Sequence, residues 1–350
     1  MNPIRSATVL THRRPSETRP AIDALIELAR ATGAILYVDP EETRKHRLEH
    51  GPGIEVDVAG PIDVDICFAL GGDGTILTAL RTYAGAGVPV FAVNFGEIGF
   101  LATVDREQAR GGFELAFAGQ YEVLSLPGIV VSGDEGDWLA INDVSMHRQP
   151  GNRVADLAYA VGQDEIGRVR CDGLVVATPA GSTGYNLANG GPVMAWGVAG
   201  FVVSFIAPHS LTARALGVAP GDVLTVLNRS QEDSVDVTVD GRPVCTLPPG
   251  REVEAHFVDA QGSLAQVPGA NFYHRLREKF GRLSSMREGA GGGGRGGRRG
   301  PRSLTGRALM VPRTPSEARP QGTMKDSCNR RQTGGPSGLC RSRPCHRRPR

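Results

Sequence analysis

Lysine, aromatic side chains and long apolar segments are all scarce in this sequence of 350 residues. Aromatic residues make up 5% of the chain, and no stretch reaches the ~20 apolar residues that a membrane-spanning helix needs. The first residues, MNPIRSATVLTHRRP, do not resemble a secretory signal, because His12, Arg13 and Arg14 interrupt a short apolar stretch. We therefore expect a cytoplasmic protein that does not enter a membrane.

Several familiar phosphate-binding and metal-binding motifs are also missing. The chain contains no GxxxxGK[ST] P-loop, no GxGxxG dinucleotide fingerprint, no HRD or DFG kinase motif and no HExxH. None of its three lysines, Lys45, Lys279 and Lys325, lies near a glycine loop of the P-loop type. If the protein handles phosphate, it must do so by another arrangement.

The six cysteines give no sign of a cross-linked or zinc-bound protein. Three of them stand in apolar, strand-like segments, namely Cys67, Cys171 and Cys245. A free cysteine in such a segment behaves as a small buried hydrophobic residue. The other three lie near the end of the chain, where CRSRPCH lacks a second ligand pair at zinc spacing. We predict no structural disulfide and no zinc.

The net charge of +2 conceals two segments of opposite sign. From Arg287 to the end there are 16 basic and 3 acidic residues, whereas the preceding part has 23 basic and 34 acidic ones. The segment 287–350 is rich in Gly and Arg and has no aromatic residue, so it cannot bury enough apolar surface to fold. We predict a disordered basic tail. Nucleic acid is an unlikely partner except non-specifically through this tail.

The first 120 residues alternate between strand and helix patterns. Residues 4–10 are strand-like, and residues 16–31 place apolar side chains at i, i+3, i+4 and i+7, as on one face of a helix. Further strands are expected at residues 34–38, 64–70 and 88–94. The run VDICFAL is apolar throughout, which suits a parallel strand covered on both faces. We predict a doubly wound α/β domain over residues 1–120.

The pattern changes after residue 120, where most segments alternate with period two. Val235, Val237 and Val239 share one face of a strand, and the following Asp240-Gly241 is a turn signal. We predict a β-rich, sandwich-like domain over residues 121–270. A helix at 271–286 is expected to pack back on the first domain.

One carboxylate stands among three glycines where a predicted strand becomes a predicted helix, in the sequence GGDGT. Gly71, Gly72 and Gly74 let the backbone adopt positive φ and approach a ligand closely. Successive N–H groups there, together with the helix N-terminus, can hold a phosphate. Asp73 suits such a site if it accepts a proton from an attacking hydroxyl or helps to hold Mg²⁺. From these five residues alone, a tight turn with a capping aspartate is an equally good interpretation.

A second segment, CDGLVVATPAGSTGYNLANGGP at residues 171–192, combines five glycines with hydroxyl, amide and aromatic side chains. A loop of this composition is costly to order unless it binds something, which favours a polar ligand with a flat ring. A third piece, INDVSMH, ends an apolar strand at Asn142 and Asp143. Taken alone, this third piece is better explained as a capped turn.

Together these pieces resemble the NAD kinase family over roughly residues 4–284. Six motifs occur in that family's order and spacing: GGDGT at 71–75, NFGEIGFL at 94–101, IND at 141–143, the segment 171–192, PHSLTAR at 208–214 and VDGR at 239–242. GGDGT alone is shared with diacylglycerol and sphingosine kinases and with phosphofructokinases, whereas the segment 171–192 is far more specific.

The resemblance implies an α/β domain and a β-rich domain with the active site between them. It also implies transfer of a phosphoryl group from ATP to the 2′-hydroxyl of the adenosine ribose of NAD, giving NADP. A divalent metal cation, Mg²⁺ by preference, would be carried on the donor, and some bacterial members also use inorganic polyphosphate. Family members are usually homodimers or homotetramers built through the β-rich domain.

The same resemblance assigns roles to individual residues. Asp73 would be the general base, and Gly71, Gly72, Gly74 and Thr75 would hold the phosphates of the donor. The residues that would contact NAD are Asp73, Gly74, Asn142, Asp143, Arg153, Arg170, Asp172, Thr183, Gly184, Tyr185, Asn186, Leu187, Ala188 and Arg242.

The sequence departs from the family's usual pattern at a few positions. Ala180, Gly184 and Asn186 replace Thr, Ala and Ser of the usual TPTGSTAYS, and Thr78 stands where many members have arginine. One alternative is a lipid or other small-alcohol kinase that shares GGDGT, but the segment 171–192 and the lack of an obvious membrane-binding helix weaken it. Another is a non-catalytic dinucleotide-binding protein, against which the intact carboxylate of GGDGT argues.

Overall fold

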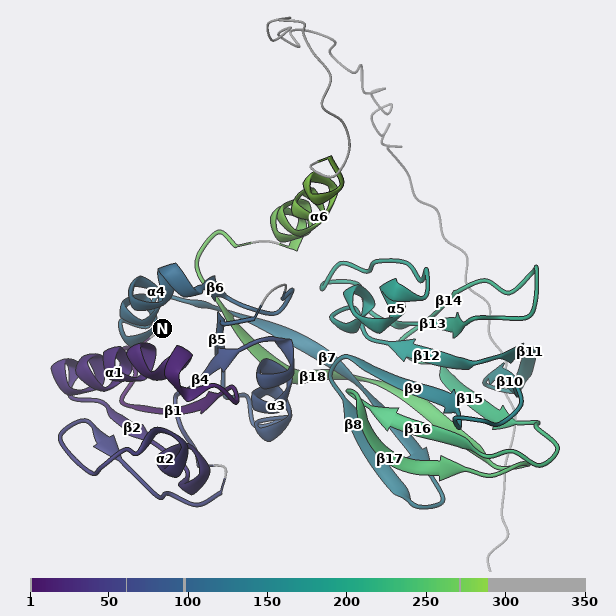
Figure 1. Cartoon of the computed structure of the whole chain (residues 1–350), viewed down its shortest axis with the longest axis horizontal. Helices are drawn as coiled ribbons and strands as arrows, with labels where there is room; N and C mark the ends of the chain where they lie inside the picture. The colour runs from purple at the N-terminus through teal and green to yellow at the C-terminus, as the bar shows by residue number, and fades with distance from the viewer. Residues whose placement is uncertain (1, 61, 97–98, 271, 289–350) are drawn as a thin grey trace, which may run out of the picture. The chain divides into compact units, whose positions relative to one another are not determined.

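The computed structural model describes residues 2–60, 62–96, 99–270 and 272–288 (Figure 1). These residues belong to one compact unit of the chain, Met1–Gly292. The disordered tail predicted from residue 287 lies outside the described ranges beyond residue 288. None of the helices in the described ranges combines the length and the apolar character that a membrane crossing requires.

Strands and helices alternate along the N-terminal part of the chain. The elements are β1 (Ser6–Thr11), α1 (Pro15–Thr32), β2 (Ile35–Tyr37), α2 (Pro40–His46), β3 (Ile54–Glu55), β4 (Ile66–Gly71), α3 (Asp73–Thr82), β5 (Val90–Asn94), β6 (Val104–Asp105), η1 (Arg106–Gln108) and α4 (Ala109–Phe117). The strands pair in parallel in the order β3-β2-β1-β4-β5, with β6 beside β5. The order reverses between β1 and β4, and at such a switch point the carboxyl ends of the strands leave a crevice.

Side chains alternate between the two faces of this parallel sheet. Phe68 and Phe91 lie on the face covered by α1 and α4, where the rings of Phe68 and Phe113 meet edge to face with centroids 5.3 Å apart. Cys67 and Ala69 lie on the opposite face, in the apolar cluster that contains α3. Helices cover both faces of the sheet, so the predicted doubly wound α/β class is confirmed for this part.

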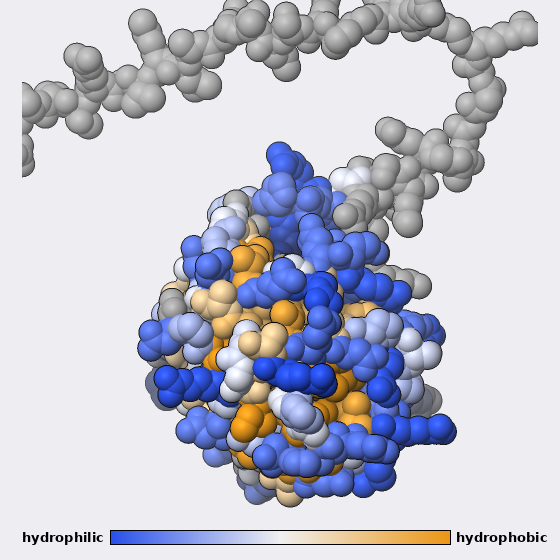
Figure 2. Space-filling view, turned by 90° about the vertical axis from the view of Figure 1, so that its left-hand side faces the viewer, coloured by the Kyte–Doolittle hydropathy of each residue, from blue (hydrophilic) through white to orange (hydrophobic). Residues whose placement is uncertain are grey.

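Helix α1 shows how closely the local sequence determines an element. It begins with Pro15, at a position where the missing N–H would have no helical partner. Ile22, Leu25 and Ala29 are fully buried, as their spacing predicts. Gly33 ends the helix in the left-handed conformation, with φ of 74°, and donates its N–H to the carbonyl of Ala29. The side of the molecule that carries α1 and α2 is mostly hydrophilic, with apolar surface showing between the polar groups (Figure 2).

The remainder of the described chain is mostly strand. The elements are β7 (Glu122–Gly133), β8 (Gly136–Ala140), β9 (Asp143–Arg148), β10 (Ala155–Val161), β11 (Asp164–Cys171), β12 (Gly173–Ala177), η2 (Gly181–Thr183), α5 (Tyr185–Ala188), β13 (Phe201–Ile206), β14 (Leu216–Val218), β15 (Val223–Asn228), β16 (Val235–Val239), β17 (Arg242–Leu247), β18 (Glu252–Gln266) and α6 (Phe272–Glu288). A sheet in the order β14-β13-β12-β9-β16-β17 is antiparallel throughout.

A shared apolar core joins that sheet to a second layer containing β7, β10, β15 and β18. Met146 and Val237 from the first sheet belong to the same buried cluster as Leu157, Val226 and Val253 from the second. Burial along β16 alternates as the valine spacing predicts. This confirms the predicted β-rich, sandwich-like part.

One long strand, β18, belongs to both parts of the fold. Near its start it pairs antiparallel with β15, and at its end Leu264 and Ala265 pair in parallel with β5. Strand β7 runs antiparallel beside β18, and the register shifts once, between Val258 and Gly262. Ala260, inside that shift, has φ of 54°. A continuous 12-stranded sheet therefore connects the α/β part with the β-rich part.

Candidate active site

A cleft of about 990 Å³ lies at the carboxyl ends of β1, β4 and β5, beside the switch point of the parallel sheet. It is lined by residues that follow each of these strands, among them His12, Arg13, Arg14, Gly74, Thr75, Thr78, Phe95 and Gly96. Residues of α2 and the turn between β16 and β17 complete the lining. We refer to it as the large cleft.

The GGDGT motif forms the junction of β4 and α3, and its glycines have a different purpose from the one predicted. None of them has positive φ, and Gly72, the N-cap of α3, has φ of −88°. The prediction that they supply positive φ is therefore wrong. Space is short at Gly71, where a Cβ would overlap the side chain of Thr75. Gly72 lies against Gly96, and a Cβ at Gly96 would lie 3.2 Å from Cα of Gly72. Gly74 has no neighbour within 4 Å of such a Cβ, so its backbone stays accessible from the large cleft.

Asp73 is the first residue of α3, and its carboxylate is held by the loop that follows β5. The oxygens accept hydrogen bonds from the backbone N–H groups of Phe100, at 3.3 Å, and Leu101, at 3.4 Å. Gly99 leaves room for this contact, since a Cβ there would lie 2.8 Å from Oδ1 of Asp73. Burial raises the pKa of Asp73, and the two hydrogen bonds oppose the rise only in part.

Helix α6 brings positive charge to the same place. Arg275 donates from Nη1 to the carbonyl of Phe100, at 2.8 Å, and to the carbonyl of Ala102. Arg275 and the buried Lys279 both act to lower the pKa of Asp73, although burial outweighs them. Since the same loop contacts both Arg275 and Asp73, α6 helps to fix the carboxylate.

Charge in the large cleft is predominantly positive. Seven basic side chains line it: His12, Arg13, Arg14, Lys45, Arg81, Arg106 and Arg242. Four carboxylates line it as well: Asp39, Glu41, Glu42 and Asp240. A cleft with this excess of cations beside a helix N-terminus suits an anionic ligand.

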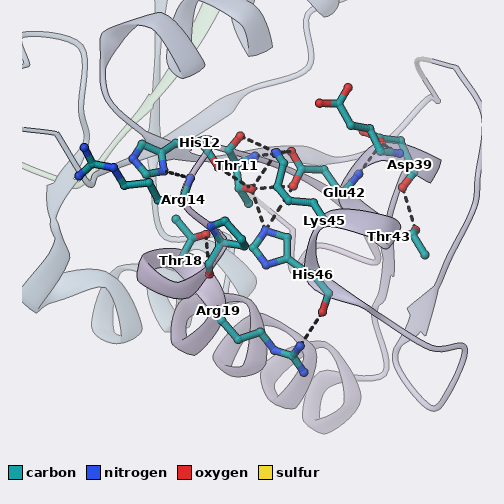
Figure 3. A network of polar contacts seen from close by, with 12 residues as sticks. Thr11, His12, Arg14, Thr18, Arg19, Asp39, Glu42, Thr43, Lys45 and His46 are labelled. Atoms are coloured by element: carbon teal, nitrogen blue, oxygen red, sulfur yellow. Dashed lines mark hydrogen bonds and ion pairs between the residues drawn. The ribbon is translucent and has the colours of Figure 1, made fainter.

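One wall of the large cleft is built by a network of polar contacts between β1 and α2 (Figure 3). The buried carboxylate of Glu42 accepts hydrogen bonds from the backbone N–H of Thr11 at 2.8 Å, from its hydroxyl at 2.6 Å and from Lys45 Nζ at 2.6 Å. Lys45 Nζ also donates to the carbonyl of Thr11, at 3.0 Å. The ammonium group of Lys45 is therefore hydrogen-bonded within the protein, and these contacts fix the carboxyl end of β1.

His46 completes this wall as a neutral, buried group. Its Nε2 lies 2.8 Å from the hydroxyl of Thr11, and since that hydroxyl gives its proton to Glu42, Nε2 acts as the donor. Nδ1 of His46 is buried and has no hydrogen-bond partner among the described residues. Burial, with smaller contributions from Lys45 and Arg19, lowers the pKa of His46 to about 4.

A smaller cleft of about 430 Å³ adjoins the large one, and Leu77 and Asp240 line both. Its other lining residues come from the β-rich part: Asn142, Asp143, Ser145, His147, Tyr185, Thr238 and Gly241. We refer to it as the small cleft. Two of the three segments singled out in the sequence, IND and the segment 171–192, therefore meet here.

The polar groups of the small cleft are only partly satisfied within the protein. Oδ1 of Asn142 is buried and has no hydrogen-bond partner among the described residues. Burial, together with the neighbouring carboxylate of Asp240, raises the pKa of Asp143 to about 7. A ligand with hydroxyl groups would supply the missing donor to Asn142.

The segment 171–192 wraps around the backbone of Asn142. The N–H of Thr178 donates to the carbonyl of Asn142 at 2.9 Å, and the Thr178 hydroxyl donates to the carbonyl of Ile141 at 2.7 Å. A Cβ at Gly181 would overlap the Asn142 carbonyl. At least this glycine is needed for packing between two motifs that lie far apart in the sequence.

Two side chains of the same segment have contrasting positions. Asn186 is fully buried, and its amide donates to the carbonyls of Ser182, at 2.9 Å, and Pro192, at 3.0 Å, which closes the loop. Tyr185 is 38% exposed, and its ring stacks on His147 with centroids 5.6 Å apart and planes at 21°. This ring pair gives the small cleft a flat aromatic wall.

Asp240 lines both clefts, whereas its sequence neighbourhood predicts only a turn. The turn is confirmed, with positive φ at Asp240 and Gly241 between β16 and β17. The buried carboxylate accepts from the N–H groups of residues 141–143, at 3.1, 2.7 and 3.2 Å, and pairs with Arg81 of α3 at 3.0 Å. Apart from the VDGR motif no local signal marks this role, since the partners lie about a hundred residues or more away in sequence.

The other residues predicted to contact NAD occupy three kinds of position. Gly74 and Arg242 line the large cleft rather than the small one, as does Thr75, which was predicted to hold the phosphates of the donor. The loop that carries Tyr185 contains Thr183, Gly184, Leu187 and Ala188. In the described chain neither cleft is lined by Arg153, Arg170 or Asp172: the two arginines are exposed, and Asp172 binds Arg148 Nε at 2.6 Å.

Fold and site together define a class of protein. A doubly wound sheet presents a helix N-terminus to a basic cleft, and a β-rich part presents a polar, aromatic-lined cleft beside it. Asp73 begins that helix next to Gly74 of the large cleft, although Asp73 itself is not among the lining residues of either cleft. This is the arrangement of a phosphotransferase that holds a phosphate donor and a second molecule side by side.

Comparison with known proteins identifies the family. The family model described as ATP-NAD kinase N-terminal domain matches residues 55–121, and that described as ATP-NAD kinase C-terminal domain matches residues 141–264. An NAD kinase of Lachnoclostridium phytofermentans is 32% identical over 285 residues, covering 78% of this chain and 98% of the relative. One of Gemmatimonas aurantiaca is 32% identical over 280 residues, covering 78% and 94%. The chain belongs to the NAD kinase family, which confirms the resemblance and disfavours the alternatives.

Solved structures agree in fold. Yeast NADH kinase complexed with NADH matches with a TM-score of 0.71 at 22% identity, covering 80% of this chain and 88% of that one. An NAD kinase from Archaeoglobus fulgidus in complex with ATP matches with a TM-score of 0.60 at 24% identity, covering 80% and 99%. These likenesses support the succession of an α/β part and a β-rich part.

Proposed function

We propose that this chain transfers the terminal phosphoryl group of ATP to the 2′-hydroxyl of the adenosine ribose of NAD, giving NADP. The observation that carries the proposal is the pair of adjoining clefts, which share Leu77 and Asp240. One cleft is basic and contains the GGDGT helix, while the other contains the unpartnered oxygen of Asn142. The NAD kinase relatives, one of them solved with ATP, support the same assignment.

ATP would occupy the large cleft. The N–H groups at the start of α3, next to the open backbone of Gly74, would receive the phosphates, and the helix dipole would favour their negative charge. The surrounding arginines add positive charge. Inorganic polyphosphate has the same repeating anionic groups, so it is proposed as a second donor.

NAD would present its adenosine to the small cleft. Oδ1 of Asn142 would accept a hydrogen bond from a ribose hydroxyl, and the stacked rings of Tyr185 and His147 would lie against the adenine. Asp143 lines the same cleft and would accept a hydrogen bond from a second hydroxyl of the ribose. Asn186, whose amide closes the loop, would keep Tyr185 in place rather than contact the dinucleotide.

Asp73 would be the general base. The ribose oxygen forms a bond to the terminal phosphorus, the bond from that phosphorus to the ADP oxygen breaks, and the hydroxyl proton passes to Asp73. Burial raises the pKa of this carboxylate, which makes it a better proton acceptor than an exposed aspartate. The loop 99–101 and α6 would hold it in position.

Mg²⁺ would enter with the donor. Mg²⁺ that accompanies a nucleotide is usually held by the phosphates together with one or two carboxylates. Asp39 and Glu41, on the wall of the large cleft, are the oxygen donors placed to take part. The ion would neutralise charge on the phosphates.

We also propose that the protein is cytoplasmic and forms a homodimer or homotetramer, as the family resemblance implies. Light scattering would test the oligomeric state.

The test is direct. Purified protein is incubated with ATP, Mg²⁺ and NAD, and NADP is measured with an NADP-specific dehydrogenase. We expect NADP from the natural sequence and a large loss in Asp73→Asn. Folded protein that makes no NADP with either ATP or polyphosphate would overturn the proposal.

A further inference from the structure

Five of the seven basic side chains of the large cleft lie near a carboxylate. Lys45 pairs with Glu42, and Arg81 pairs with Asp240. Three more, His12, Arg14 and Arg106, approach Glu17. The other two, Arg13 and Arg242, line the cleft and make no ion pair within the described part of the chain. Of these two, Arg242 also hydrogen-bonds to α3.

Arg242 reaches across from the β-rich part to the first turns of α3. Its Nη2 donates to the hydroxyl of Thr78 at 3.3 Å, and that hydroxyl donates to the carbonyl of Gly74 at 2.9 Å. The guanidinium group is therefore tied through one side chain to the GGDGT motif. Nη2 of Arg81 meets the same hydroxyl at 3.3 Å, but its charge is already neutralised by Asp240.

The base of Arg242 is firmly positioned. It is the first residue of β17 and follows directly on the turn whose Asp240 carboxylate binds three backbone N–H groups and Arg81. Only the guanidinium end then needs to be ordered when a ligand binds. A planar guanidinium with one nitrogen on Thr78 still has N–H groups free for two phosphate oxygens.

We infer that Arg242, held against Thr78 of α3, binds the phosphate chain of the donor in the large cleft. The β-rich part thereby contributes to the donor site as well as to the site for NAD. This inference rests on the proposed function and gives Arg242 a different role from the contact to NAD that the family resemblance implies. It makes Arg242 a determinant of donor affinity.

The test compares Arg242→Ala and Arg242→Lys with a matched control, Arg251→Ala. Arg251 is an exposed arginine just before β18 that pairs with Asp134 and lines neither cleft. For each variant the KM for ATP is measured at saturating NAD, and the KM for NAD at saturating ATP. Binding of inorganic tripolyphosphate is followed by calorimetry, and thermal unfolding verifies the fold.

We expect Arg242→Ala to raise the KM for ATP by about tenfold to a hundredfold, as loss of a charge-assisted hydrogen bond does, and to weaken tripolyphosphate binding similarly. For Arg242→Lys we expect a KM for ATP between those of the natural protein and Arg242→Ala, since lysine keeps the charge and lacks the paired N–H groups of the guanidinium. The KM for NAD should change less than about twofold, and Arg251→Ala should match the natural protein. A rise confined to the KM for NAD, or no change in either KM, would overturn the inference. Loss of NADP formation by the natural protein itself would instead overturn the proposed function.

Discussion

The two adjoining clefts differ in how far their polar side chains are already paired within the protein. In the large cleft five of the seven basic side chains lie near carboxylates of the protein, and the excess of positive charge favours an anionic ligand. In the small cleft Asn142 Oδ1 lacks a partner among the described residues, and the carboxyl of Asp143 has its pKa raised to about 7. The small cleft therefore keeps buried polar groups that a ligand completes, and this favours specificity over simple charge attraction.

Their glycines differ in the same sense. Around Gly74, beside the large cleft, a Cβ would meet nothing within 4 Å, whereas at Gly181 and Gly191 it would overlap the Asn142 carbonyl and the Asn186 side chain. One glycine leaves backbone open to a ligand, and the other two allow protein to pack on protein. Glycine content alone therefore does not reveal which purpose a loop serves.

The largest effect should come from the carboxylate next to the large cleft. Asp73→Asn removes the proposed proton acceptor and keeps the size and shape of the side chain. We therefore expect kcat to fall by about a hundredfold to ten-thousandfold. The KM values for ATP and NAD should stay close to those of the natural protein, since the clefts themselves are unchanged. Steady-state NADP formation measures both quantities. An unchanged kcat would show that Asp73 is not the general base of the reaction.

A buried acid in the small cleft should make stability fall as pH rises. The pKa of Asp143 is raised from its ordinary value of 3.8 to about 7, so between these values the folded protein holds a proton that the unfolded chain has lost. The free energy of unfolding therefore decreases across this window. Asp143→Asn should remove about 2 to 4 kcal/mol of that decrease, measured by urea denaturation at pH 4.5 and pH 8. Parallel pH profiles of variant and natural protein would contradict the raised pKa.

A buried base in the wall of the large cleft should act with the opposite sign. The pKa of His46 is lowered to about 4 from 6.5, so between these values the unfolded chain binds a proton that the folded protein does not. Stability should rise with pH through this window, by about 2 to 3 kcal/mol. His46→Gln keeps a donor toward Thr11 and should flatten the profile there. His256→Gln, at a half-buried histidine beside Glu254 that lines neither cleft, controls for the substitution itself.

The smallest effects should come from the glycines, and they test the comparison most directly. Gly181→Ala should lower the free energy of unfolding by about 1 to 3 kcal/mol through overpacking against Asn142. Gly74→Ala should leave it nearly unchanged and raise the KM for ATP instead. Gly197→Ala, where a Cβ meets nothing within 4 Å, controls for the substitution itself. Equal losses of stability at Gly74 and Gly181 would show that the two segments use glycine alike.

Much of the fold follows from local pattern. The apolar runs of β4 and β5, the face of α1 and the alternation along β16 all appear in the sequence, because burial on one face or two imposes a period. The motif GGDGT and the pair Asn142-Asp143 were also singled out by residue type. What these patterns do not provide is the positions that the chain brings together from far apart.

Asp240 and Glu42 illustrate what was missed. Asp240 looks like a turn residue until its carboxylate is seen against Arg81, 159 residues away, and Glu42 looks like a surface acid until it is seen against Thr11. The basic run at residues 12–14 offered a usable signal, since it follows a predicted strand of a parallel sheet just as GGDGT does.

Strand β18 has a consequence for how the enzyme works. One hydrogen-bonded ribbon of β7 and β18 runs from the β-rich part into the parallel sheet, and its register shifts once, around Ala260. The two clefts are therefore joined by continuous strands as well as by Leu77 and Asp240, which line both. In the proposed function the folding of the chain places donor and acceptor side by side, so that part of the entropy lost in aligning them is lost before either substrate binds.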